Sequence, residues 1–441
     1  MNAPKITDFG DLPKPQINRF TAPNGVNVSV VNGCEQDIFQ LLIILPGGKC
    51  DSTNPRHAMA TASMLNKGSI AHNAEEIAAK FDHLGVSFSA GSYNHHTVLS
   101  LTGLNRTAQS AMPILKEILA EPTFPSDRLS ILKRQLTDML GQNEAKTDFL
   151  ASRKFTELLY GPRHPLSRFT RNNPIATLSR TDLVDFHSKY LKSTNANIIL
   201  AGNISDKIID NALAIFDKSW QHTAVSAPKP KIVKANSHPE KSLFVLHKEN
   251  AVQSGIVTGT IFKNTSDEEF TKLKLLTHLL GGYFGSRLMQ SIREQKGYTY
   301  GISAVAQENE GIRHMIIRTD CSIKFTEKVI AAIEDEIRGL IEETIEKDEL
   351  KLVKSSILSS YASSIDNAFN IANLEASRIL KHRPFDSFER DIHTINTTTV
   401  GDLYALAQQH LQGNAFYTVV ATDCASSDLP VLPAKKDMSN Y

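Results

Sequence analysis

Hydrophobic positions in the first half of the chain follow a strand period and then a helix period. Residues 26–31 alternate valine with polar residues and residues 38–45 are almost continuously apolar, which predicts two adjacent strands after a polar, proline-bearing arm that ends near Asn18. Further strands are expected at 87–93, 97–104 and 197–201. Helices are expected at about 56–65, 74–84, 106–120, 127–140 with Ser126 as cap, 148–159, 180–190 and 205–216.

The same order of elements begins again in the second half. Strands are expected at 243–247 and 254–262, followed by a helix at 268–280, a short helix, and strands at 298–306 and 313–320. Helices are then expected at 324–342, at 347–379 as one long element, and at 400–411, before a last strand at 417–421.

Three segments of the two halves correspond in this order. Residues 81–91 match 292–303, residues 127–136 match 348–357, and residues 181–191 match 401–411. A duplication predicts two homologous α+β domains, at 1–222 and 237–441, joined by a linker rich in proline, lysine and alanine at 223–236. Each domain should be a mostly antiparallel sheet with helices on one face, and the two should form a clamshell around a cavity.

Composition and charge restrict the class of partner. The 441 residues are 41% hydrophobic and 22% charged, with a formal net charge of +1, so electrostatics favour neither nucleic acid nor a membrane as the main partner. The four cysteines, Cys34, Cys50, Cys321 and Cys424, are scattered, as is typical of free thiols in a reducing compartment. With no signal peptide visible, we expect a cytoplasmic protein, and a periplasmic one is the alternative.

The most informative stretch is residues 281–301, GGYFGSRLMQSIREQKGYTYG. Ser286 is expected to cap a short helix that ends at Gly297, and a strand follows at once. This order places Arg293, late in the helix, beside Tyr300, early in the strand. The alternative is that Arg293 is an ordinary surface residue and Tyr300 a half-buried strand residue.

The run SRLMQSIREQKGYTYG closely resembles the stretch that carries an arginine and tyrosine pair in the M16 metallopeptidases, the pitrilysin, insulinase and mitochondrial processing peptidase family. The resemblance covers most of the chain. It implies that Arg293 and Tyr300 hold the scissile carbonyl of an extended peptide while a zinc site elsewhere attacks it. Gly281, Gly282 and Ser286 are the further candidates for contact with substrate.

The zinc site of that family is H-x-x-E-H on a helix, with a glutamate farther along the chain. The phrase MLNKGS at Met64–Ser69 resembles the end of that helix and sets the register. The two histidine positions then fall on Met59 and Ser63 and the glutamate on Ala62, and only Asp138 lies near the position of the later glutamate. Thioether, methyl and hydroxyl groups cannot replace two imidazoles and a general base, so we expect no zinc and no other cofactor in this chain.

The remaining histidines do not predict another metal site. His57 is expected to be an exposed residue at a helix start, and His164 to belong to a structural Gly-x-x-His-Pro turn. His95 and His96 are adjacent, so in a regular strand they point to opposite faces and cannot both bind one ion.

The sequence gives little support for phosphate binding or for nucleophilic catalysis. The glycines of GGYFGSR follow a helix and lack the lysine of a phosphate loop, and no nucleophile signature is present. An arginine and a tyrosine stabilise an oxyanion but generate no nucleophile, so the chain alone should not hydrolyse peptides. The leading hypothesis is the non-zinc subunit of a heterodimeric M16 peptidase whose homologous partner carries zinc. The alternative is an inactive homologue that binds peptides or acts as a scaffold.

Overall fold

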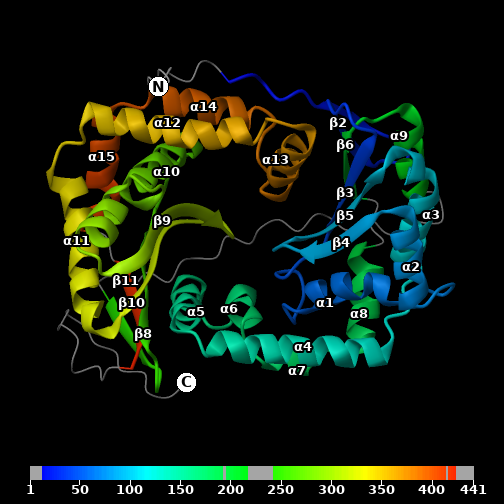
Figure 1. Cartoon of the computed structure of the whole chain (residues 1–441), viewed down its shortest axis with the longest axis horizontal. Helices are drawn as coiled ribbons and strands as arrows, with labels where there is room; N and C mark the ends of the chain where they lie inside the picture. The colour runs from blue at the N-terminus through cyan, green and yellow to red at the C-terminus, as the bar shows by residue number, and fades with distance from the viewer. Residues whose placement is uncertain (1–11, 192–194, 217–241, 414–415, 424–441) are drawn as a thin grey trace, which may run out of the picture.

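The computed structural model describes residues 12–191, 195–216, 242–413 and 416–423. The linker predicted at 223–236 and the fourth cysteine, Cys424, lie outside the described residues. Two halves lie side by side around a central gap, with the first half in blue to green on the right and the second in green to red on the left (Figure 1).

The first half contains a six-stranded sheet in the order β1-β2-β6-β3-β5-β4. All neighbouring strands are antiparallel except β2 and β6. The strands are β1 Asn18–Thr21, β2 Asn27–Asn32, β3 Ile38–Pro46, β4 Ser87–Ser92, β5 His96–Leu104 and β6 Asn197–Gly202.

The five-stranded sheet of the second half repeats this topology. Its order, β7-β11-β8-β10-β9, corresponds strand for strand to β2-β6-β3-β5-β4, and again one pair, β7 with β11, is parallel. The predicted duplication and the mostly antiparallel α+β fold are therefore confirmed. The strands are β7 Ser242–His247, β8 Gln253–Ile261, β9 Thr299–Asn309, β10 Ile312–Ser322 and β11 Tyr417–Thr422.

Helix ends also repeat between the halves. Capping boxes begin α8 at Ser179 and α15 at Thr399, and left-handed glycines, Gly85 and Gly297, both at φ 62°, precede the two edge strands. Ser126 is the first residue of its helix and does not cap it. The helices of the first half are α1 His57–Met64, α2 Ala74–Leu84, α3 Asn105–Ala120, α4 Ser126–Glu144, α5 Thr147–Tyr160, α6 Pro165–Phe169, α7 Asn173–Ala176, α8 Arg180–Phe186 and α9 Asp206–Leu213. Those of the second half are α10 Asp267–Gly281, the π-helix η5 Met289–Gln295, α11 Thr326–Glu342, α12 Lys347–Ser363, α13 Ala368–Leu380, α14 Ser387–Thr397 and α15 Val400–Leu411.

One helix of each half packs on the sheet of the other half. The apolar face of α5 packs on β8 and β11, where Phe155 is 1% exposed and its ring lies against Gly259, a position at which a Cβ would clash with the ring. In the same way α13 packs on β6 and β2 through Ala368, Ala372 and Ala376. Each sheet therefore has helices of its own half on one face, as predicted, and a helix of the other half on the opposite face.

The single long helix predicted at 347–379 is wrong. The chain leaves α12 after Ser363, and Asn367 starts α13 by accepting hydrogen bonds from the backbone N–H groups of Phe369 and Asn370. Polar side chains that bond to nearby backbone compete with helix propagation, and the segment between the helices is rich in them. This break allows α13 to turn across to the other half.

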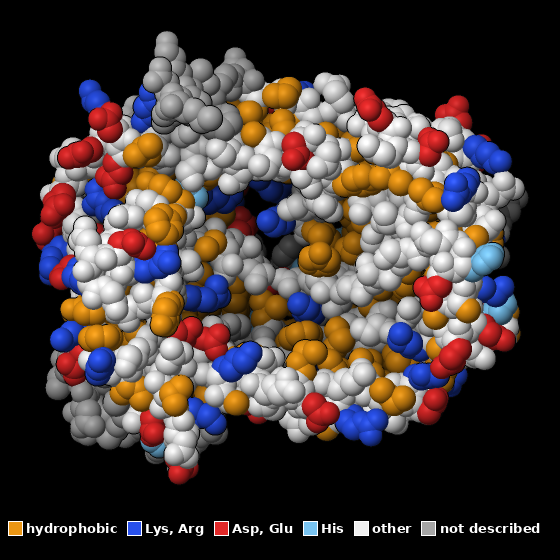
Figure 2. All heavy atoms as spheres, viewed as in Figure 1, with side chains coloured by type: hydrophobic (Ala, Val, Ile, Leu, Met, Phe, Trp, Pro, Cys, Tyr) orange, Lys and Arg blue, Asp and Glu red, His pale blue; other side chains and the backbone are white. Residues whose placement is uncertain are grey.

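A hollow separates the two halves in the middle of the molecule (Figure 2). The edge strands β4 and β9 face it from opposite sides, and α5, α6 and α13 lie around it (Figure 1). The clamshell predicted from the duplication is therefore present. Within the described residues, no helix is both long and apolar enough to cross a bilayer.

Candidate functional site

The helix-to-strand turn predicted around Arg293 is formed. Leu288 and Ile292 are fully buried and anchor η5 to the core, and the N–H of Gly297 donates to the carbonyl of Arg293 at 3.1 Å. The N–H of Tyr298 donates to the carbonyl of Ile292 at 3.0 Å, which ties the start of the strand to the helix. The segment is a π-helix, a rare form that is frequent at functional sites.

Tyr300 sits on a β-bulge of the edge strand β9. Thr299 pairs with Cys321 and Ile302 with Thr319, so that Tyr300 and Gly301 together lie opposite the single residue between those two partners. A bulge turns a side chain away from the direction that regular pairing would give it. The side chain of Tyr300 is 93% exposed, which excludes the half-buried strand position considered as the alternative.

Two threonine hydroxyls hold this bulge in place. Thr299 Oγ1 donates to the carbonyl of Asp320 at 2.6 Å and accepts from the N–H of Gly301 at 3.1 Å. Thr319 Oγ1, on β10, lies 2.8 Å from the carbonyl oxygen of Gly301 and 2.9 Å from Thr299 Oγ1. Neither threonine was among the predicted site residues, although Thr299 lies inside the phrase GYTYG and was a visible signal.

Arg293 is partly exposed and its side chain makes few contacts. Its side chain is 35% exposed, its guanidinium lies 5.1 Å from the ring centroid of Phe284, and Nη1 lies 3.4 Å from a carboxylate oxygen of Glu294. Among the described residues no hydrogen bond joins Arg293 to Tyr300. The pair lies on consecutive elements and presents a cation and a hydroxyl to solvent, which is a donor arrangement suited to an oxygen with developing negative charge.

The glycine pair before the turn has a packing role in the structure. A Cβ on Gly281 would lie 2.7 Å from Ala304 of β9, and one on Gly282 would lie 2.2 Å from the ring of His278. His278 stacks on Tyr283, with ring centroids 5.3 Å apart, and burial lowers the pKa of His278. Gly281 therefore lets α10 lie close to the strand that carries Tyr300, and Gly282 leaves room for the ring of His278.

Ser286 differs from its predicted role as a helix cap. It is 1% exposed, and its hydroxyl oxygen has no hydrogen-bond partner among the described residues. The backbone carbonyl of Ser286 accepts from Gln290, so the residue belongs to the helix start through its backbone.

The positions of the family's zinc ligands contain no ligand set. Ser63 Oγ lies 3.7 Å from Met59 Sδ one turn of α1 away, and Ala62 is buried. The i, i+4 contact confirms that Met59 and Ser63 share one face of the helix, as two zinc-binding histidines would. Asp138 is exposed on α4. The residues present at these positions do not fit a zinc ion.

The other histidines are engaged in local contacts. His57 is the first residue of α1 but is not exposed, because its side chain is 12% accessible, with Nδ1 2.7 Å from Ser52 Oγ and Nε2 3.7 Å from Asp182. Burial lowers the pKa of His57, and Asp182 opposes that shift. His164 accepts a hydrogen bond from the N–H of Leu166, as expected of a structural turn.

His95 and His96 diverge, as predicted. His95 bonds to carboxylates of both halves, whereas His96 stacks near His382 with ring centroids 5.5 Å apart.

Both edge strands that border the hollow have an unpaired side. Within the described residues β9 pairs only with β10, and β4 only with β5. An unpaired edge offers backbone donors and acceptors to an extended peptide. The structure is therefore a clamshell with two free strand edges at its hollow, an exposed Tyr300 on one of them, and no metal-ligand set at Met59, Ala62 and Ser63 of α1.

Comparison with known proteins agrees with this fold. Residues 177–357 match the family model described as "Peptidase M16 inactive domain". The chain is 23% identical over 414 residues to "Uncharacterized zinc protease YmxG" of Bacillus subtilis, covering 90% of this chain and 99% of that protein. It is 25% identical over 327 residues to "Non-peptidase homolog YmxG" of Helicobacter pylori, covering 71% and 72%.

A solved structure shows the same fold over almost the whole chain. The crystal structure described as a peptidase M16 inactive domain from Pseudomonas fluorescens superposes with a TM-score of 0.82 at 22% identity, covering 93% of this chain and 98% of that one. Residues 177–357 are therefore similar to the inactive domain of M16 peptidases, and almost the whole chain has the fold of the Pseudomonas fluorescens structure.

Proposed function

We propose that this chain is the non-zinc subunit of a heterodimeric M16 endopeptidase. In this proposal a homologous partner supplies zinc and the attacking water, and Arg293 and Tyr300 stabilise the oxyanion that forms on the scissile carbonyl. The observation that carries the proposal is the 93% exposure of Tyr300 on a braced bulge, in the strand that follows the helix of a partly exposed Arg293. In the same chain, Met59 and Ser63 stand on α1 where the resemblance places zinc-binding histidines.

The substrate would be an extended peptide lying along β9. Its backbone would pair with the free edge of that strand, and the carbonyl to be cleaved would lie at the bulge. Donors placed where charge develops act on the barrier more than on binding. In this arrangement Gly281 contributes by letting α10 approach β9, and Gly282 and Ser286 by their places in the turn before the helix. We also propose a cytoplasmic location, because the described cysteines, Cys34, Cys50 and Cys321, are all free thiols.

The experiment is to mix this chain with a zinc-bearing M16 homologue from the same organism and to measure cleavage of an unstructured peptide. We expect endopeptidase activity in the mixture that neither chain has alone, because nucleophile and oxyanion donors must meet around one carbonyl. Full activity of the partner alone, unchanged by this chain, would contradict the proposal.

The second candidate is a non-enzymatic homologue that binds peptides or acts as a scaffold. The description of the Helicobacter pylori relative as a non-peptidase homologue favours it. It predicts that the chain binds an extended peptide as a stable homodimer or within a larger complex, and that replacing Tyr300 changes no reaction rate in any mixture.

A further inference from the structure

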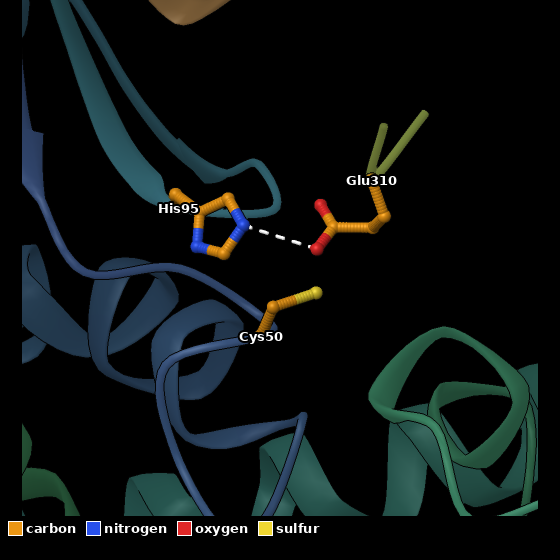
Figure 3. Close-up of side chains that lie close together, drawn as sticks. All are labelled: Cys50, His95 and Glu310. Carbon is orange, nitrogen blue, oxygen red and sulfur yellow. Dashed lines mark hydrogen bonds and ion pairs between the residues drawn. The ribbon is translucent and has the colours of Figure 1, made fainter. Parts of the chain in front are cut away.

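Three potential metal ligands from the two halves meet where the tips of two hairpins touch. His95 lies between β4 and β5, Glu310 lies in the turn between β9 and β10, and Cys50 lies in the loop after β3. A ligand atom of each lies within 4.8 Å of the others. The imidazole and the sulfur both face the carboxylate (Figure 3). The side chains of His95 and Glu310 are only 10% and 4% exposed, whereas Cys50 is half-buried.

The imidazole of His95 is oriented by a second carboxylate. Asp51 Oδ1 lies 2.8 Å from His95 Nδ1, and the other oxygen of Asp51 accepts from the N–H of Gly48 at 2.8 Å. The remaining ring nitrogen, Nε2, lies 3.1 Å from Glu310 Oε2. A carboxylate on one ring nitrogen and a metal on the other is the usual arrangement of metal-binding histidines.

Glu310 is held in place by both its side chain and its backbone. Its Oε1 accepts from Asn94 Nδ2 at 2.7 Å, which leaves Oε2 directed at the cluster. Glu310 and Gly311, with φ of 52° and 73°, form the two-residue turn of the β9–β10 hairpin. Positions of this kind favour asparagine or glycine, so a glutamate there carries a steric cost. Its carboxylate is the group that reaches the other half.

We propose that Cys50, His95 and Glu310 bind a Zn²⁺ ion that joins the two halves of the clamshell. Thiolate, imidazole and carboxylate are ligands that zinc accepts in tetrahedral sites, with a water in the fourth position. Two light ligand atoms of such a site lie about 3.3 Å apart, close to the 3.1 Å between His95 Nε2 and Glu310 Oε2. The sulfur has to approach the other two atoms by about 1 Å at most.

Zinc binding here displaces two protons to solvent, one from the thiol of Cys50 and one from Nε2 of His95, as the metal forms bonds to both atoms. The site is distinct from the family's catalytic position at Met59 and Ser63, and it does not depend on the proposed peptidase role. No metal was predicted at His95, because its neighbour His96 points to the opposite face and cannot bind the same ion. The ligands that join His95 come from a loop and from the other half of the chain.

The test uses the full chain after treatment with a chelator. Calorimetric titration with Zn²⁺ should show one ion per chain, and Co²⁺ should produce a thiolate-to-metal charge-transfer absorption. Cys50→Ser should abolish that absorption and the stoichiometric binding of zinc. Asp51→Asn, which removes the group that orients His95, should weaken zinc binding by about 10-fold to 100-fold.

The matched control is Cys34→Ser, because Cys34 is also a free, partly exposed thiol but belongs to no group of three potential ligands in the described part of the chain. It should bind zinc as the wild type does. Zinc should also raise the urea midpoint of the wild type and of Cys34→Ser but not that of Cys50→Ser. Absence of stoichiometric zinc binding by the folded wild type would overturn the proposal, as would unchanged binding in both Cys50→Ser and Glu310→Gln.

Discussion

Arg19 and Glu375 form a two-point ion pair between the two halves of the molecule. Nε and Nη2 of Arg19, on β1, donate to the two carboxylate oxygens of Glu375, on α13, at 2.8 and 2.9 Å. Arg378 donates to the same carboxylate from one turn along α13, and the hydroxyl of Ser29 does so from β2. The side chain of Glu375 is 1% exposed, so this buried network holds α13 of the second half against the sheet of the first half.

Replacing that carboxylate should destabilise the protein strongly. Glu375→Gln leaves Arg19 and Arg378 without a counter-charge in a mostly buried place, and loss of one member of a buried pair costs about 3–5 kcal/mol. Because Arg19 is 30% exposed, we expect the lower end of that range. Urea unfolding of the wild type and of Glu375→Gln measures this loss in the free energy of unfolding. The control Glu249→Gln, at an exposed position between β7 and β8, should change the free energy of unfolding by less than about 0.5 kcal/mol.

The same network gives a pH dependence with a definite sign. Burial alone would raise the pKa of Glu375, but Arg19 and Arg378 outweigh it and lower the pKa to about 2. The stabilisation is therefore complete above the usual glutamate pKa of about 4.3 and is lost as the pH falls toward 2. The stability difference between wild type and Glu375→Gln should narrow over that interval. A constant difference from neutral pH to pH 2 would show that the charge of Glu375 is not its cause.

The exchange of α5 and α13 predicts that the halves cannot separate when the chain is cut. A protease site placed in the predicted linker at 223–236 should yield two fragments that remain together through gel filtration. The first fragment alone would expose the apolar face of α5 and the sheet face that α13 covers. The second fragment alone would expose the apolar face of α13 and the sheet face that α5 covers. Elution of two folded, separate fragments would show that the predicted domains at 1–222 and 237–441 are independent.

Sequence patterns predicted the parts of the fold that local chemistry determines. The predicted repeat rested on three pairs of matching segments, and one of those pairs carries Gly85 and Gly297, which act within one turn of chain. The order of the strands in the sheets was not predicted. The exchange of helices did not follow, because an apolar helix face does not specify which sheet will cover it. Likewise Arg293 and Tyr300 were found by their spacing, whereas Thr319 braces the bulge from a neighbouring strand and gave no local signal.

Removing the hydroxyl of Thr319 should disturb catalysis by the proposed complex without unfolding the chain. Thr319→Val keeps the shape of a side chain that is 6% exposed but loses the contacts with Gly301 and Thr299. We expect a loss of about 1–3 kcal/mol in stability and a fall in kcat larger than any change in KM, since Tyr300 would be less well positioned. Thr258→Val is the control, because it removes a similar buried hydroxyl pair from the same sheet, away from the bulge. Equal kcat values for the two variants would show that Thr319 does not position Tyr300.

Control substitutions for Arg293 and Tyr300 must be made at residues with few contacts. Arg287, on the same helical segment, donates two hydrogen bonds of 2.8 Å to Glu349, so its replacement would also cost stability. Arg338, 60% exposed on α11, and Tyr404, 38% exposed on α15, offer milder replacements. Arg338→Ala and Tyr404→Phe should leave the activity of the mixed complex unchanged.

In the proposed complex, Arg293 and Tyr300 stabilise an oxyanion that a partner's zinc site generates. Single-turnover cleavage of a peptide by the mixed complex with Arg293→Ala or Tyr300→Phe tests this role, with folding checked by circular dichroism. We expect each change to lower the rate by about 10² to 10³, or roughly 3–4 kcal/mol in the barrier, while peptide affinity is largely kept. Wild-type rates in both variants would contradict it and leave the pair without a catalytic role.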